Sequence, residues 1–266
     1  MKRLFLTGYT GFLGKHIFER WDGDIYLYGR DQDVSRMIDY KPDYVIHGAA
    51  EIKNEEKMFE SNIKLTYDML EAARKTSSIK AFIYVGSSSE YGRKKHPMEE
   101  TNFLDPETVY EATKGAGTLL CQAYARTYGL PVMIARPFSL YGKHEPKERL
   151  IPTAIKCAKA GWEMSIAPGV HDFINIDDFI DGLFMLLENP QPGEIYNFGT
   201  GKQLSNDDVV ENIEKLVGRQ VDRLPVNKMR SYDSNSWVCD NTKAKELGWE
   251  PKYTFKKGIE NVLARK

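Results

Sequence analysis

Two short strings in the middle of this sequence contain the residue types that acid–base chemistry needs. Ser87 follows the apolar run Phe82-Ile-Tyr-Val-Gly86, and Tyr110 precedes Lys114 by four residues where a long helical pattern begins. On a helix this spacing places the phenol and the ammonium on one face, so we expect the cation to lower the tyrosine pKa from its usual value of about 10. A serine hydroxyl at a strand end can hold a carbonyl oxygen while the tyrosine gives it a proton. We therefore predict a catalytic set of Ser87, Tyr110 and Lys114.

Tyrosine is followed by lysine at this spacing at three places in the chain, so the local pattern has to separate them. Tyr91 and Lys95 lie in an apparent loop, and Tyr253 and Lys257 lie in a C-terminal stretch with no matching strand before it. Only Tyr110 begins a long helical pattern downstream of a strand-end serine. The alternative for Tyr110 is an ordinary surface tyrosine–lysine pair.

A glycine-rich turn near the N-terminus predicts a dinucleotide site. Gly8, Gly11 and Gly14 fall between an expected strand and an expected helix, where glycine lets the backbone approach a diphosphate at the helix N-terminus. The spacing differs from the G-x-G-x-x-G fingerprint of many dehydrogenases, and an ordinary strand–helix turn is the alternative. The cofactor-binding residues predicted in this turn are Gly8, Thr10, Gly11, Phe12, Leu13 and Gly14.

The end of the second expected strand bears on the choice of cofactor. An acidic residue at this place accepts hydrogen bonds from the adenosine ribose of NAD, whereas this chain has Tyr28-Gly29-Arg30. A guanidinium can pair with a ribose phosphate, and the small Gly29 leaves room for it, so the pattern favours NADP(H). The following Asp31 keeps NAD(H) possible, and a solvated Arg30 is the alternative.

Short apolar runs alternate with longer helical patterns through the first half of the chain. The expected strands are residues 4–7, 25–28, 44–47, 81–85 and 132–135, and the expected helices are residues 12–20, 55–74 and 108–128. The connection 31–42 is short for a full helix. This rhythm predicts an α/β fold with a doubly wound parallel Rossmann sheet.

The rhythm changes after Arg136-Pro137, which predicts a smaller C-terminal substrate lobe. A helix is expected over 152–160, while a helix over 173–187 and a strand over 194–198 could rejoin the main sheet and make the lobe discontinuous. The predicted Rossmann domain is therefore 1–141 plus about 172–203, and the predicted substrate-binding lobe is about 142–171 plus 204–266.

The overall composition excludes several classes of partner. The chain has 266 residues, and its 37 basic and 38 acidic residues give a net charge of −1, so no field favours nucleic acid or an anionic membrane. No window approaches the ~18 apolar residues of a membrane helix, and the early apolar run stops at the glycine turn. Three scattered cysteines suit reduced thiols in a cytoplasmic protein. No metal site is predicted.

Taken together, these motifs resemble the extended short-chain dehydrogenase/reductase superfamily, in its NAD-dependent epimerase/dehydratase branch that acts on nucleotide sugars. The resemblance also rests on Asp43-Tyr-Val-Ile-His-Gly-Ala-Ala50, Ala135-Arg-Pro-Phe-Ser-Leu-Tyr-Gly142, Asp172-Phe-Ile-Asn-Ile-Asp-Asp178, Tyr196-Asn-Phe-Gly-Thr-Gly201 and Leu247-Gly-Trp-Glu-Pro251. It implies that Ser87, Tyr110 and Lys114 are the catalytic triad and that Ala49, Ala50, Tyr110, Lys114 and Pro137 contact the cofactor. It also implies a nucleotide-diphosphate sugar substrate and a homodimer built on the helix that bears Tyr110 and the helix before it.

Departures from the family pattern bear on the reaction. The sugar 4,6-dehydratases place an acidic pair directly after the catalytic hydroxyl, where this chain has Ser88 and Ser89. The 3,5-epimerase/reductases use a cysteine at the second of these positions and a later histidine, for which His144 is only a loose candidate. His171 stands where relatives often carry an arginine for the diphosphate. The predicted substrate contacts are Ser88, Ser89, His144, Arg149, His171 and Arg230.

Three hypotheses for the function follow. The first is reduction of a 4-keto nucleotide sugar by NADPH, which needs only the triad and the cofactor. The second is a nucleotide-sugar 4-epimerase that uses the same triad with tightly bound NAD. The third is a dinucleotide-sensing protein without catalysis, which the intact triad disfavours.

Overall fold

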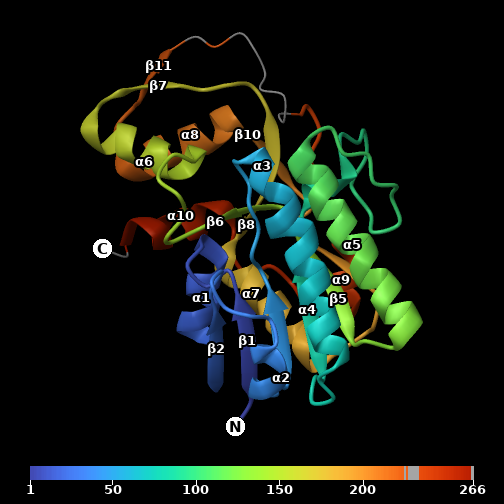
Figure 1. Cartoon of the computed structure of the whole chain (residues 1–266). Coiled ribbons are helices and arrows are strands. Elements are labelled where there is room, and N and C mark those ends of the chain that lie inside the picture. Colours follow the sequence, from blue (N-terminus) through green and yellow to red (C-terminus); the bar gives the residue numbers. More distant parts are fainter. Residues whose placement is uncertain (225, 227–233, 265–266) are drawn as a thin grey trace.

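The chain folds around a central sheet of six parallel strands, as the computed structural model shows for residues 1–224, 226 and 234–264 (Figure 1). The strand order is β2-β1-β3-β4-β5-β9. The strands are β1 (Arg3–Thr7), β2 (Asp24–Tyr28), β3 (Tyr44–His47), β4 (Ala81–Val85), β5 (Val132–Pro137) and β9 (Ile195–Phe198). This confirms the predicted fold class, and β9 returns to the sheet beside β5 as expected.

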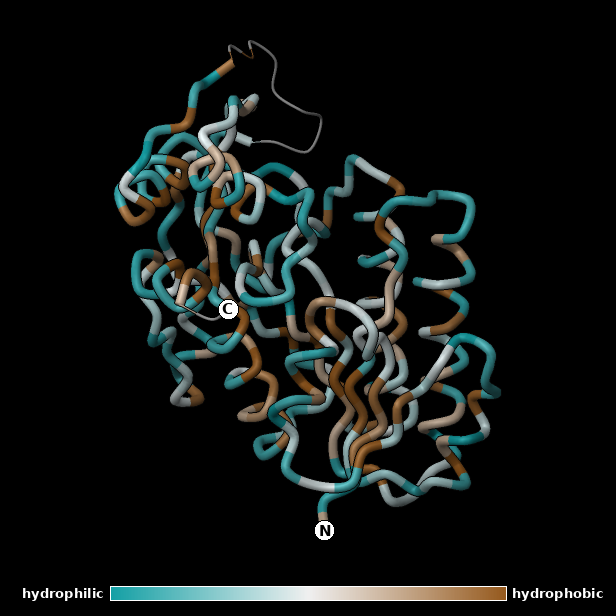
Figure 2. Tube along the Cα trace, turned by 90° about the vertical axis from the view of Figure 1, so that its left-hand side faces the viewer, coloured by the Kyte–Doolittle hydropathy of each residue, from teal (hydrophilic) through white to brown (hydrophobic). Residues whose placement is uncertain are grey.

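Alternating side chains along the strands build one core on each face of the sheet. Leu4 and Leu6 pack on one face and Phe5 on the other, because successive strand residues point to opposite sides. The first face is covered by α1 (Phe12–Arg20) and α7 (Ile176–Glu188), and the second by α2 (Arg36–Tyr40), α4 (Leu65–Arg74) and α5 (Val109–Tyr128). Figure 2 shows the resulting concentration of hydrophobic residues in the central strands.

Two expected helices are interrupted or shifted. Residues 55–74 form not one helix but α3 (Glu55–Met58), the π-helical turn η1 (Phe59–Lys64) and α4. The expected helix over 173–187 is wrong at its start: Phe173 to Asn175 belong to β8 (Val170–Asn175), which pairs with two neighbouring strands. The Asn175 side chain then accepts from the Asp177 amide and caps α7. Strand pairing outweighs the apolar spacing that predicted a helix here.

A lobe above the carboxyl ends of the main strands has its own small core (Figure 1). In it β8 lies between β6 (Ser139–Tyr141) and β10 (Gln203–Ser205), and β7 (Glu163–Ser165) pairs with β11 (Asp222–Leu224). The helices α6 (Leu150–Ala160), α8 (Asn206–Val217) and α10 (Phe255–Ala264) pack around this core. The short α9 (Thr242–Glu246) instead packs with the main sheet. The predicted domain boundaries stay a prediction.

Candidate active site

The glycine turn after β1 has the shape that a close approach of backbone to ligand requires. Gly8 has φ +75°, and a Cβ there would lie 2.8 Å from the backbone of Gly48 and Ala49. A Cβ on Gly14 would collide with the Gly8 carbonyl, so this glycine lets α1 start directly against the strand. Gly11 is the N-cap of α1 and no side chain caps the helix. The first amides of α1 are thus available to an anion.

A cavity of about 770 Å³ opens beside this turn, at the point where the strand order reverses around β1. Its walls come from the ends of β1, β2 and β3 and from η1. The predicted cofactor residues that line it are Gly8, Thr10, Gly11, Arg30, Ala49 and Ala50. Phe12 and Leu13 pack against the main-sheet core, and Pro137 ends β5. The uncapped helix and the glycine cradle fit the diphosphate of a dinucleotide.

Arg30 and an acidic group lie at the far end of this cavity. The Arg30 side chain is 72% exposed and its Nη2 lies 3.9 Å from the Glu51 carboxylate. Nothing lies within 4 Å of a Cβ placed on Gly29, so the space next to Arg30 is open. Asp33 also lines the cavity, where its carboxylate accepts from the Ser35 amide. Both a guanidinium and a carboxylate are therefore within reach of a ribose at this end.

Ser87 lies at the carboxyl end of β4 and is the N-cap of a 3₁₀ turn, η2 (Ser88–Tyr91). Its Oγ is 2.7 Å from the Ser89 Oγ, and its amide donates to Glu90 Oε1 at 2.8 Å. The Ser87 side chain also lies close enough to Tyr110 to act on the pKa of its phenol. The structure thus brings the predicted serine and tyrosine together, although they are 23 residues apart in the sequence, and places Ser89 next to them.

Tyr110 lies in the first turn of α5, whose N-terminus is fixed by a capping box between Thr108 and Glu111. Burial raises the Tyr110 pKa to about 12, against the lowering effect of the nearby Ser87 side chain. The expected lowering of this pKa by Lys114 is therefore wrong for the free protein. The lysine is itself buried, with 3% of its surface exposed, and Nζ donates to the Val85 carbonyl at 2.6 Å. Burial lowers the Lys114 pKa to about 8.

A buried ion pair under the triad was missed by sequence reasoning. Glu90 and Arg136 are both fully buried, and the Glu90 Oε2 lies 2.8 Å from the Arg136 Nη2. The available signal was the spacing of Ser87 and Glu90, which is that of a capping box, and the structure contains this box. In the sequence, Glu90 directly precedes Tyr91 and Gly92, and nothing local distinguishes it from an ordinary residue of that string.

The predicted substrate contacts differ in where the structure places them. Ser88 is buried, and its hydroxyl accepts a hydrogen bond from the Trp237 indole at 3.2 Å. The hydroxyl therefore faces this indole and not an open cavity. His144 has a left-handed φ of 65° and turns to α1, where its Nε2 lies 3.1 Å from the Glu19 carboxylate. Neither placement supports a role as a substrate contact.

The other predicted substrate contacts do not all lie near the triad. Arg149, at the start of α6, pairs with Glu145 at 3.4 Å, and its charge acts to lower the Tyr110 pKa, so it lies near the triad. His171 packs against Phe173 within the lobe, with ring centroids 5.6 Å apart. Arg230 lies outside the residues that the structure describes.

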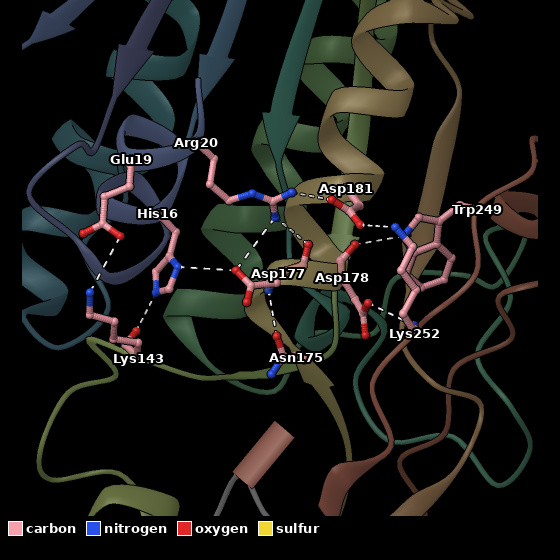
Figure 3. A network of polar contacts seen from close by, with 10 residues as sticks. All are labelled: His16, Glu19, Arg20, Lys143, Asn175, Asp177, Asp178, Asp181, Trp249 and Lys252. Atoms are coloured by element: carbon pink, nitrogen blue, oxygen red, sulfur yellow. Dashed lines mark hydrogen bonds and ion pairs between the residues drawn. The ribbon is translucent and has the colours of Figure 1, made fainter. Parts of the chain in front are cut away.

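A polar network fixes the loop after β6 to α1 (Figure 3). The buried His16 ring lies 2.6 Å from the Lys143 carbonyl and also packs edge-on against His144. From the same helix Arg20 donates to the Asp177 carbonyl at the start of α7. This explains the turn of His144 away from the triad: the histidine belongs to the joint between α1 and the loop that leads to Arg149.

Known proteins resemble this chain in sequence. The profile described as "NAD dependent epimerase/dehydratase family" matches residues 4–199. The glycan biosynthesis protein Agl12 of Haloferax volcanii is 30% identical over 249 residues, covering 90% of this chain and 79% of that protein. The trifunctional dehydratase/epimerase/reductase RHM1 of Arabidopsis thaliana is 30% identical over 83% of this chain, which spans only 35% of that protein.

Solved structures share the architecture. The RMD protein of Pseudomonas aeruginosa, solved with NADPH, superposes with a TM-score of 0.86 at 24% identity, covering 99% of this chain and 98% of that one. Within residues 1–224, 226 and 234–264, no helix combines the length and apolarity needed to cross a bilayer. The sequence matches, the parallel sheet and the glycine cradle agree, and the chain belongs to the NAD-dependent epimerase/dehydratase family.

Proposed function

We propose that this protein reduces the 4-keto group of a nucleotide sugar with NADPH. The observation that carries the proposal is the set of groups directly after Ser87. Ser88 is covered by Trp237, Ser89 bonds to Ser87, and the first carboxylate, on Glu90, is held by Arg136. Elimination of water needs a positioned acid or base, and these residues offer none at that place. Ketone reduction needs only the hydroxyl pair and the lysine.

The residues of the triad divide the work of reduction between them. The neighbouring Ser87 and Tyr110 hydroxyls would both donate to the ketone oxygen. The bound dinucleotide supplies the hydride that reaches the carbonyl carbon. Tyr110 then gives its proton to the oxygen, so the ketone becomes an alcohol, and solvent returns a proton to the phenolate. Because its pKa is about 12, Tyr110 holds this proton throughout the neutral range.

NADPH is favoured over NADH by the end of β2. The exposed Arg30 guanidinium and the open space beside Gly29 suit a 2′-phosphate. The structural relative RMD was solved with NADPH. The alternative is a nucleotide-sugar 4-epimerase with tightly bound NAD, and the Asp33 carboxylate in the same cavity favours it, since an acid there can accept from a free ribose hydroxyl.

The two reactions differ in their use of cofactor, which gives the test. Protein purified without added nucleotide would be examined by mass spectrometry for bound cofactor. NADPH oxidation would then be followed with UDP-, dTDP- and GDP-linked 4-keto-6-deoxy sugars. We expect stoichiometric consumption of NADPH with one of them. Retained NAD together with interconversion of 4-epimers and no net NADPH consumption would contradict the reductase and support the epimerase.

We also propose a homodimer, built on α5 and the helices before it. Large apolar side chains stay uncovered on these neighbouring helices, and α4 and α5 lie side by side on the outer surface (Figure 1). They are Phe59, Tyr67, Leu119 and Tyr128. Exposed apolar side chains on neighbouring surface helices support a protein contact in this region. We also propose a location in the cytoplasm, which is compatible with a dimer and with a small-molecule substrate.

A charge at Leu119, on the exposed side of α5, is expected to separate the dimer. Leu119 is 59% exposed on α5, and Leu119→Arg would place two guanidinium groups in an apolar contact. Light scattering should then give the mass of one chain instead of two. The control is Trp162→Arg, because Trp162 is similarly exposed, at 54%, but lies next to α6 in the lobe. A wild-type protein with the mass of one chain would contradict the proposal.

A further inference from the structure

We propose that Glu90 is a positioning residue of this active site, whose carboxylate clamps the elements that carry the triad and supplies the negative charge beneath them. The proposal rests on the reductase function above. It assigns a role to a residue that the hydride-transfer chemistry itself does not use.

The Glu90 carboxylate joins three separate elements. Oε1 accepts from the Ser87 amide at 2.8 Å, which fixes the backbone at the end of β4. Oε2 accepts from the Thr118 hydroxyl on α5 at 2.7 Å and from Arg136 Nε on β5 at 3.0 Å. Because two of these elements carry Ser87 and Tyr110, the clamp sets the distance over which the two hydroxyls meet.

Thr118 shows how the clamp reaches the helix. Tyr110, Lys114 and Thr118 follow one another at four-residue intervals on α5 and therefore lie along one stripe. Tyr110 lies beside Ser87, whose side chain acts on the phenol pKa. Lys114 Nζ donates to the Val85 carbonyl, and the Thr118 hydroxyl donates to Glu90. Hydrogen bonds thus attach the stripe at two successive levels to the end of β4 and the turn after it, and Glu90 provides one of these two attachments.

The groups of the clamp are buried and tightly packed. Glu90 and Arg136 have no exposed surface, and the Arg136 guanidinium lies 4.5 Å from the centroid of the Tyr91 ring. A Cβ on Gly86 would come within 2.6 Å of Glu90 Oε1, so the strand end leaves room for the carboxylate and little more. Without water to screen it, the charge of Glu90 acts over several ångströms.

That charge acts on both titrating members of the triad. The Lys114 pKa is lowered by burial, and the charge of Glu90 opposes this lowering. The Tyr110 pKa is raised by burial, and the charge of Glu90 raises it further. In both cases Glu90 favours the protonated group. A carboxylate with this effect keeps Tyr110 protonated and Lys114 cationic. A neutral hydrogen-bond acceptor at the same place would not do so.

Glu90→Gln tests the charge separately from the shape. The amide oxygen of glutamine can still accept from the Ser87 amide, whereas the negative charge is gone. The matched control is Thr118→Val, which removes one hydrogen bond to Glu90 and leaves its charge. Two readouts apply to each variant: the titration of Lys114 by NMR of protein carrying ¹³C-labelled lysine, assigned by its loss in Lys114→Met, and the pH profile of kcat/KM for NADPH-dependent reduction.

We expect Glu90→Gln to lower the Lys114 titration midpoint and the alkaline limb of the rate profile by about one pH unit, the lower end of the shift that a neighbouring charge gives. Thr118→Val should leave both at their wild-type positions. Unchanged midpoints in a folded Glu90→Gln protein would overturn the proposal, since a purely structural role lowers the rate at every pH without moving either.

Loss of one partner of a buried ion pair can prevent folding, so a second variant is needed. Glu90→Gln combined with Arg136→Met removes both charges and leaves neither of them buried alone. Its Lys114 titration should shift in the same direction. The NMR readout does not depend on turnover: a wild-type protein that reduces no ketone would contradict the proposed function, while the Lys114 midpoints would still decide the role of Glu90.

Discussion

Tyr110→Phe is expected to reduce kcat/KM for ketone reduction by about 10³-fold, the middle of the range that a positioned acid or base contributes. The phenol is the proton donor in the proposed step, and its removal leaves Ser87 to hold the ketone oxygen alone. Binding of NADPH, measured by fluorescence titration, should change little, because the glycine cradle and α1 are untouched. The loss should therefore appear in kcat.

The chain offers its own control for this experiment. Tyr253 is also followed by a lysine four residues later, and the Lys257 ammonium lies 5.7 Å from the centroid of its ring. Tyr253→Phe removes the same phenol oxygen far from Ser87 and should leave the rate at the wild-type value. Comparable activities for Tyr110→Phe and Tyr253→Phe would contradict the catalytic role of Tyr110 and with it the proposed mechanism.

The raised pKa of Tyr110 determines the protonation state in which this group enters the reaction. A phenol with a pKa of about 12 is protonated at neutral pH and is ready to donate, whereas alcohol oxidation requires the phenolate. The sequence alone predicts the opposite shift, because the spacing of Tyr110 and Lys114 indicates a nearby cation but contains no information on burial. In the folded protein burial is the largest influence on both groups: it raises the Tyr110 pKa and lowers the Lys114 pKa.

The fold was more accessible to sequence reasoning than the details of the site. Strands such as Ala81–Val85 are short apolar runs between polar segments, and their local pattern is sufficient to place them. Phe173 and Ile174 have the same apolar character, but together with Asn175 they become a strand through pairing with β6. Such pairing joins distant segments and leaves no local signal, so the predicted helix began too early.

The same limit explains the errors among the polar residues. Ser88 follows the catalytic serine, yet its hydroxyl faces Trp237, which is 149 residues away in the sequence. His144 lies near the site in sequence order, but a left-handed backbone turns it to Glu19. Glu90 and Arg136 each look like a surface charge until the fold buries both. Partners of this kind are chosen by the tertiary structure.

Lys114→Met is expected to abolish most of the activity and to stabilise the protein at neutral pH. The rate should fall by about 10²-fold or more, because the cation that assists Tyr110 is lost. The lowering of the Lys114 pKa from 10.5 to about 8 corresponds to a burial penalty of about 3 kcal/mol for the charged form. The lost hydrogen bond to Val85 and the contact with the Tyr84 ring offset about 2 kcal/mol of this. A gain of about 1 kcal/mol, or ~2–4 °C in Tm, should remain.

The sign of the effect follows from the protonation of Lys114 in the two states. Below pH 8 the lysine is charged both folded and unfolded, so the native wild-type protein carries the full penalty. Between 8 and 10.5 only the unfolded chain keeps the proton, and wild-type stability rises with pH through this window. The wild-type protein gains about 3 kcal/mol across this window, which exceeds the advantage of about 1 kcal/mol, so the advantage of Lys114→Met in thermal unfolding should be largest at neutral pH and reverse before pH 10.5. Lys257→Met, an exposed control, should show no such trend, and a Lys114→Met protein less stable than wild type at pH 7 would mean that the contact with Val85 outweighs the cost of burying the charge.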